Sequence, residues 1–148
     1  MGSRRRAREL TLQFLYQYDT LNESSSEKVD LEEALTLFGA LNEKSADNDT
    51  DGFAALLMRG TNESTEGIDR IINRFSEHWK LSRMPRIDRN ILRLAVYEMV
   101  YMQETPYPVV INEAIEIAKK FGSEESGAFV NGILDQIRMA MEKGELDD

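Results

Sequence analysis

Four arginines lie within five positions at the start of the chain: Arg4, Arg5, Arg6 and Arg8. A guanidinium group presents a planar fork of N–H donors that matches the oxygens of a phosphate. Residues 1–10 contain these four arginines and one glutamate, although the whole 148-residue chain has a net charge of −9. A local basic cluster on an acidic chain predicts binding of one specific anionic site. It argues against a protein that coats nucleic acid with its whole surface.

The arginines belong to a predicted helix over residues 4–21, which Ser3 can cap. An apolar stripe runs along this helix at spacings of three and four residues: Ala7, Leu10, Phe14, Tyr18 and Leu21. The opposite side carries two arginines, two leucines and a tyrosine: Arg5, Arg8, Leu12, Leu15 and Tyr16. Because aromatic rings stack on unpaired bases, Tyr16 and the arginines predict an RNA-facing edge, whereas Leu12 and Leu15 should pack on a second bundle. The alternative is a solvated helix end without a ligand.

Two other patterns could carry chemistry, and both have a simpler explanation. Residues 47–52, DNDTDG, match the first half of an EF-hand loop, but Met58 occupies the position that needs a bidentate glutamate, so a solvated loop is favoured. His78 is the only histidine and there is no cysteine, which excludes a two-histidine metal site, a cysteine-ligated metal site and thiol catalysis. Beside Trp79, at a predicted helix end, His78 should pack or face solvent. The sequence predicts neither an enzyme nor a cofactor.

The rest of the chain predicts further helices and no sheet. Apolar residues recur at helical spacing in six more segments: residues 30–41, 53–61, 64–79, 87–102, 109–121 and 123–141. Residues 87–102 are apolar nearly all round and should form the central helix. The predicted fold class is all-α, with about seven helices in two small bundles. We expect a break near residue 80, between an N-terminal bundle (1–80) and a C-terminal bundle (81–148) that together form one compact unit.

Polar residues and a glycine mark the expected helix ends. Asp30 should open the second helix, with Glu33 at capping-box spacing. Gly122 should end the sixth helix in the usual manner of a C-terminal glycine, and Ser123 should cap the seventh.

Composition and hydropathy place the chain among soluble globular proteins. About 41% of its residues are hydrophobic and 30% are charged, which is an ordinary balance for that class. No run approaches the roughly 18 apolar residues of a membrane span, and the basic N-terminus lacks the apolar segment of a signal peptide. We therefore expect a cytoplasmic protein.

Four parts of the chain resemble the NusB family of transcription antitermination factors. In the first helix these are residues 4–10, RRRAREL, with Gln13, Leu15 and Tyr16. In the fifth predicted helix the matching residues are 87–98, IDRNILRLAVYE. The longest and most specific block is residues 106–122, PYPVVINEAIEIAKKFG, and residues 129–135, FVNGILD, follow it. Together they cover both ends and nearly the whole chain.

The resemblance implies an all-helical fold of two small bundles and a role without catalysis. Family members pair with the ribosomal small-subunit protein NusE, and the pair binds the single-stranded boxA element of nascent RNA, notably in ribosomal RNA operons. This helps RNA polymerase to ignore terminators. By matching position, the implied RNA contacts are Arg4, Arg5, Arg6, Arg8, Tyr16, Glu125 and Phe129. Asp88 matches an acidic position that faces the protein partner, and in the first turn of its helix it should reach solvent.

Two departures from the family pattern make one part of the RNA edge less basic. Lysine often follows the Pro-Tyr pair in such families, and Pro108 stands there. A basic pair often precedes the Phe-Val-Asn-Gly block, and Gly127 and Ala128 stand there. We therefore expect less positive charge near the seventh helix than in the family pattern.

Other functions remain open at this point. Some RNA cytosine methyltransferases carry a NusB-like N-terminal domain, but those chains continue into a large catalytic domain, whereas this sequence stops at Asp148. A helical adaptor that binds only protein is an alternative from another class. A homodimer is also possible, and it could bury the arginine edge of the first helix and block RNA.

Overall fold

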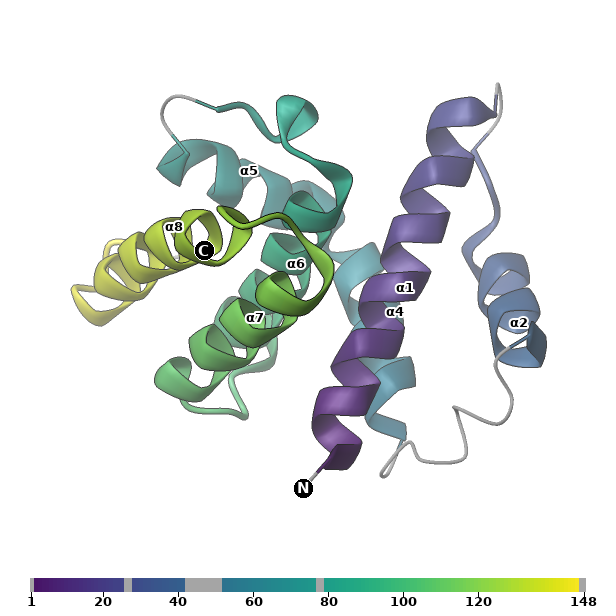
Figure 1. Cartoon of the computed structure of the whole chain (residues 1–148), viewed down its shortest axis with the longest axis horizontal. Helices are drawn as coiled ribbons and strands as arrows, with labels where there is room; N and C mark the ends of the chain where they lie inside the picture. The colour runs from purple at the N-terminus through teal and green to yellow at the C-terminus, as the bar shows by residue number, and fades with distance from the viewer. Residues whose placement is uncertain (1, 26–27, 42–51, 77–78, 147–148) are drawn as a thin grey trace. The chain divides into compact units, whose positions relative to one another are not determined.

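A computed structural model describes residues 2–25, 28–41, 52–76 and 79–146, and within these ranges every regular element is helical (Figure 1). The first helices are α1 (Gly2–Ser24), α2 (Leu31–Leu41), α4 (Phe53–Glu63) and α5 (Thr65–Phe75). The 3-10 turn η2 (Leu81–Arg83), helix α6 (Arg86–Val96) and the π-helical segment η3 (Tyr97–Met102) follow. The last are α7 (Tyr107–Phe121) and α8 (Ser126–Glu142). The predicted all-α fold class is confirmed. None of these helices combines the length and apolar character needed to cross a membrane.

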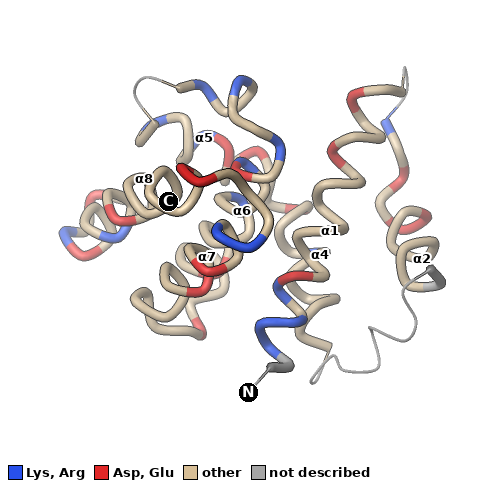
Figure 2. The backbone as a smooth tube through the Cα atoms, viewed as in Figure 1, with Lys and Arg blue, Asp and Glu red and all other residues tan. Residues whose placement is uncertain are grey.

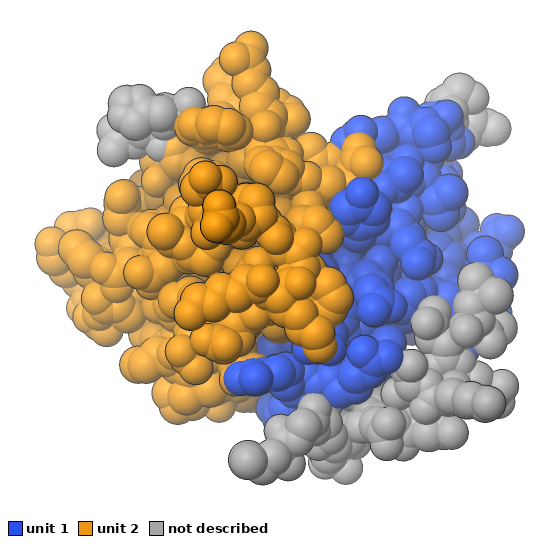
Figure 3. Space-filling view, in the orientation of Figure 1, with its two compact units in different colours: residues 1–63 blue, residues 64–148 orange. Residues whose placement is uncertain are grey.

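The chain divides into two compact units, Met1–Glu63 and Ser64–Asp148 (Figure 3). The boundary falls earlier than the expected break near residue 80, because α5 packs on α6 and α8. Asp69 of α5 forms an ion pair with Arg93 of α6, with Nε–Oδ1 and Nη2–Oδ2 distances of 2.9 and 3.1 Å. Helix α5 therefore belongs to the C-terminal bundle.

In the first unit, α1 packs on α4 and α2. The ring of Phe14 stacks on Tyr18 with centroids 5.7 Å apart, and it meets the edge of Phe38 of α2 at 5.5 Å. The carboxylate of Asp30 accepts the backbone N–H of Glu33 at 3.0 Å, so Asp30 opens α2 as predicted. These contacts fix the exposed side of α1 relative to its own bundle.

The two predicted faces of α1 are both largely buried. The apolar stripe is buried from Ala7 to Tyr18, but Leu21 is 45% exposed because the last turn of α1 lies outside the core. On the opposite side, Leu12 and Leu15 are buried as well. Polar surface on α1 is therefore confined mainly to its first turn and to the stretch after Leu15.

In the second unit, α6 is the central helix and packs on α5, α7 and α8. From Asp88 to Val96 every residue except Arg93 is buried, which confirms the predicted central position. The predicted helix over residues 87–102 is α-helical only as far as Val96, however, because its hydrogen bonds follow the wider π-helical pattern in η3. The N–H of Gln103, at φ 55°, bonds to the carbonyl oxygen of Glu98 at 2.9 Å and closes this segment.

Candidate nucleic-acid interface

The first turn of α1 presents arginines to solvent, and the start of this helix is marked as basic in Figure 2. Arg4 and Arg5 are exposed. The side chain of Arg6 is 38% exposed, and its Nη1 lies 3.4 Å from Oε1 of the buried Glu9. The N-terminal end of a helix also carries a partial positive charge. The arginines and the helix end therefore act together to attract an anion.

Arg8 differs from the other arginines because its side chain is buried, with 5% exposure. Its Cζ lies 5.3 Å from the ring centroid of Phe53, the first residue of α4, and Cζ of Arg4 lies 4.0 Å from the same centroid. The expectation that Arg8 stands on an exposed edge is wrong. A guanidinium over an aromatic face is favourable, so Phe53 holds Arg8 in the bundle while Arg4 stays accessible.

Tyr16 lies on the same side of α1 as Arg5. The two residues are eleven positions apart, which is about three turns and about 16 Å along a helix. The side chain of Tyr16 is 37% exposed. A ligand that contacts both residues must therefore be extended along the helix, as a single strand of nucleic acid is.

The remaining predicted RNA contacts lie at the start of α8, in the second unit. Glu125 is exposed and accepts a hydrogen bond from Oγ of Ser123 at 3.5 Å. Phe129 is partly exposed, and its ring meets the edge of Trp79 with centroids 6.1 Å apart. The sequence grouped Trp79 with the helix over residues 64–79, but α5 ends at Phe75 and leaves Trp79 outside it.

Asp88 is buried, with 4% exposure, so the expectation that its carboxylate reaches solvent is wrong. Its Oδ1 accepts a hydrogen bond from Oγ of Ser126 at 2.7 Å, and that Oγ accepts the backbone N–H of Ser123 at 2.9 Å. Ser126, and not Ser123, is therefore the side chain that binds a backbone N–H before α8. Asp88 joins the first turn of α6 to the first turn of α8, where Glu125 and Phe129 lie.

Gly122 ends α7, but not through the left-handed conformation that is common for a C-terminal glycine. Its φ and ψ are −98° and −162°, which is extended backbone. A Cβ at this position would lie 2.4 Å from Oγ of Ser126 and 2.9 Å from the carbonyl oxygen of Ala118. Glycine is needed here because the Ser126 side chain approaches the backbone so closely.

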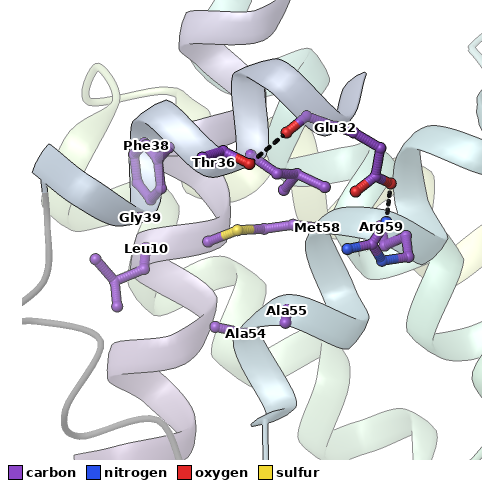
Figure 4. Close-up of a pocket in the computed structure, with 10 residues that line it drawn as sticks. Leu10, Glu32, Thr36, Phe38, Gly39, Ala54, Ala55, Met58 and Arg59 are labelled. Carbon is purple, nitrogen blue, oxygen red and sulfur yellow. Dashed lines mark hydrogen bonds and ion pairs between the residues drawn. The ribbon is translucent and has the colours of Figure 1, made fainter. Parts of the chain in front are cut away.

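The first unit also contains a cavity of about 300 Å³ between α1, α2 and α4 (Figure 4). Its lining is mostly apolar and includes Leu10, Phe38 and Met58. Arg59 and Glu32 form an ion pair at its edge. An apolar lining whose guanidinium is already paired does not suit a phosphate backbone, so the cavity is not part of the candidate interface.

Two of the other candidate patterns fall outside the described ranges. These are His78 and residues 47–51 of the half EF-hand motif. Among the residues that the structure does describe, no group of three or more histidine, cysteine, aspartate or glutamate side chains could hold a metal ion.

These features define a small helical protein with an exposed basic helix start and an aromatic site at the start of another helix. The NusB family model matches residues 5–139, and the chain belongs to the NusB family. A protein of Trichlorobacter lovleyi named transcription antitermination protein NusB is 47% identical over 148 residues, which cover 100% of this chain and 99% of that protein.

Solved structures agree with the family assignment. NusB of T. maritima has a TM-score of 0.75 and 39% sequence identity, and the match covers 97% of each chain. A chain in the structure of antitermination factors NusB and NusE in complex with double-stranded RNA has a TM-score of 0.76 and 27% identity. That match covers 95% of this chain and 98% of the other.

Proposed function

We propose that this protein is a transcription antitermination factor that binds RNA and has no catalytic activity of its own. Together with the ribosomal protein NusE it binds boxA-type single-stranded RNA in nascent ribosomal RNA transcripts, and the complex modifies elongation by RNA polymerase in the cytoplasm. The observation that carries this proposal is the exposed pair Arg4 and Arg5 at the positive end of α1, with Tyr16 three turns further on the Arg5 side. Membership of the NusB family supports it.

Each group in the candidate interface has its own role in this proposal. Arg4, Arg5 and Arg6 contact phosphates, which fix the position of the strand without reading its sequence. Tyr16 and Phe129 stack on unpaired bases. Arg8 supports the cluster through Phe53, because its guanidinium is buried against that ring.

The acidic residues act around α8. Glu125 is exposed at the start of this helix, where its carboxylate accepts N–H groups of a base or the O–H group of a ribose and repels a misplaced phosphate. We assign Asp88 to the NusE-binding surface as a positioning residue, because its buried carboxylate holds Ser126 and with it the start of α8. A homodimer that covers the start of α1 would compete with RNA.

The proposal is tested by fluorescence anisotropy of a labelled boxA-type RNA titrated with the full chain, alone and at saturating NusE. A scrambled RNA of the same composition is the control for specificity. We expect NusE to raise the affinity for boxA-type RNA more than the affinity for the scrambled RNA. Thermodynamic linkage requires that each RNA raise the affinity for NusE by the same factor. Binding of NusE without any RNA affinity would instead identify a protein adaptor.

A further inference from the structure

Trp79 is the only tryptophan in the chain, and half of its surface is exposed. Its ring meets Phe129 at a centroid distance of 6.1 Å with an angle of 62° between the ring planes. Because the rings are far from parallel, Phe129 supports the indole without lying flat over it. Exposed aromatic rings of this size are typical of binding surfaces, where one part of the ring is packed and the other is accessible.

The backbone on both sides of Trp79 is held by hydrogen bonds. The N–H of Trp79 bonds to the carbonyl oxygen of Ser76 at 3.2 Å. The N–H of the buried Leu81 bonds to Oδ1 of Asn73 at 2.9 Å. The backbone that carries the indole is therefore held in place before any ligand arrives, which lowers the entropic cost of binding.

The positive charges that follow Trp79 in the chain favour an anionic ligand beside it. Lys80 follows it directly and Arg83 lies in η2, and both side chains are exposed. The N–H of Arg83 bonds to the carbonyl oxygen of Lys80 at 2.9 Å, which holds the turn that carries both cations. Glu124 and Glu125 are exposed just before α8, the helix that carries Phe129, and they disfavour phosphate there.

We propose that Trp79, supported by Phe129, is a stacking site for an unpaired base of bound RNA, and that Lys80 and Arg83 contact the adjoining phosphates. This inference rests on the proposed RNA-binding function and adds a contact that the arginine-rich start of α1 does not provide. Stacking on an aromatic ring tolerates any base, so Trp79 contributes affinity more than sequence preference.

The single tryptophan makes the test direct. Intrinsic tryptophan emission of the full chain is titrated with unlabelled single-stranded boxA-type RNA, with and without NusE. We expect quenching that saturates at the same RNA concentrations as the anisotropy of a labelled strand. Trp79→Ala should weaken RNA binding about 5-fold to 100-fold, and Trp79→Phe should retain most of the affinity. Leu56→Ala, an equally exposed apolar residue of the first unit, is the control and should leave affinity unchanged.

The possible outcomes separate this inference from the proposed function. RNA binding with unchanged tryptophan emission, and with equal affinity for Trp79→Ala and the parent, overturns the role of Trp79 and leaves the proposed function intact. No RNA binding by the parent, alone or with NusE, overturns the proposed function. If NusE alone changes the tryptophan emission and Trp79→Phe loses affinity for NusE, then Trp79 contacts the protein partner and not RNA. That result would overturn the inference.

Discussion

Arg4 and Arg8 lie one turn apart on α1, and both guanidinium groups lie over the ring of Phe53. Arg4 is exposed and Arg8 is buried, so the same residue type has two roles within one short cluster. An exposed guanidinium costs little to bring to a phosphate. A buried one must first be brought out of the bundle, so Arg8 contributes to stability more than to RNA affinity.

Arg8→Ala is expected to lower the free energy of unfolding by about 2 kcal/mol, since a desolvated cation–π contact and the packing of the side-chain stem are lost together. Arg5→Ala removes the same charge from an exposed position and should change stability by less than about 0.5 kcal/mol. Urea unfolding of the two variants measures the difference. Equal midpoints would show that the contact of Arg8 with Phe53 does not stabilise the bundle.

Asp88 and Ser126 are predicted to be energetically coupled. Asp88→Ala removes the acceptor of a buried 2.7 Å hydrogen bond and should cost about 1.5–3 kcal/mol, because hydrogen bonds to charged groups lie in this range. In a double-mutant cycle with Ser126→Ala, the two losses should be non-additive by about 1 kcal/mol or more. Strictly additive losses would mean that the two side chains stabilise the fold independently.

At the scale of elements, the approach of α7 to α8 depends on the absence of a side chain at Gly122. Gly122→Ala places a methyl group 2.4 Å from Oγ of Ser126, which is fixed by Asp88 and Ser123, and should cost about 1–3 kcal/mol. Gly132→Ala, inside α8, meets nothing within 4 Å and should stabilise the helix by about 1 kcal/mol. Thermal unfolding should shift in opposite directions for the two variants, and a shared direction would refute the steric argument.

Helix positions could be predicted from the sequence because apolar residues repeat with the period of the buried face. Helix ends could be predicted only where one local side chain decides them, as Asp30 does for α2. The end of α5 could not, because it depends on Ser76, whose Oγ bonds back to the carbonyl oxygen of Ile72 and whose backbone leaves the helical conformation at φ −109° and ψ 73°. A serine side chain that bonds to the backbone in this way competes with further helical turns. The spacing of apolar residues does not reveal where this happens.

The candidate site was predictable in part for a similar reason. Arg5 and Tyr16 lie on the same side of one helix, so helical spacing alone places them on a common edge. Burial of Asp88 depends on Ser126, which lies 38 positions further along the chain. Exposure of Trp79 depends on where α5 ends. Both are tertiary properties, and residue types and local spacing do not determine them.

At the scale of the whole molecule, charge is distributed unevenly. The chain carries a net charge of −9, yet its first ten residues contain four arginines and one glutamate. An acidic surface repels polyanions in general, whereas the start of α1 attracts them locally. This arrangement favours binding of one RNA segment at one site over coating of nucleic acid.

The salt dependence of RNA affinity tests this account most directly. The slope of log K against log[salt] is measured for the parent and for two variants that each lose two positive charges. One variant replaces the exposed Arg4 and Arg5 by alanine, and the other replaces Lys28 and Lys143, which are exposed near the opposite end of α1 and the end of α8. Each phosphate contact on a single strand contributes about −0.7 to the slope, so the arginine variant should have a slope shallower by about 1.4, while the lysine variant keeps the parental slope. Equal slopes for the arginine variant and the parent would contradict the claim that the start of α1 binds RNA.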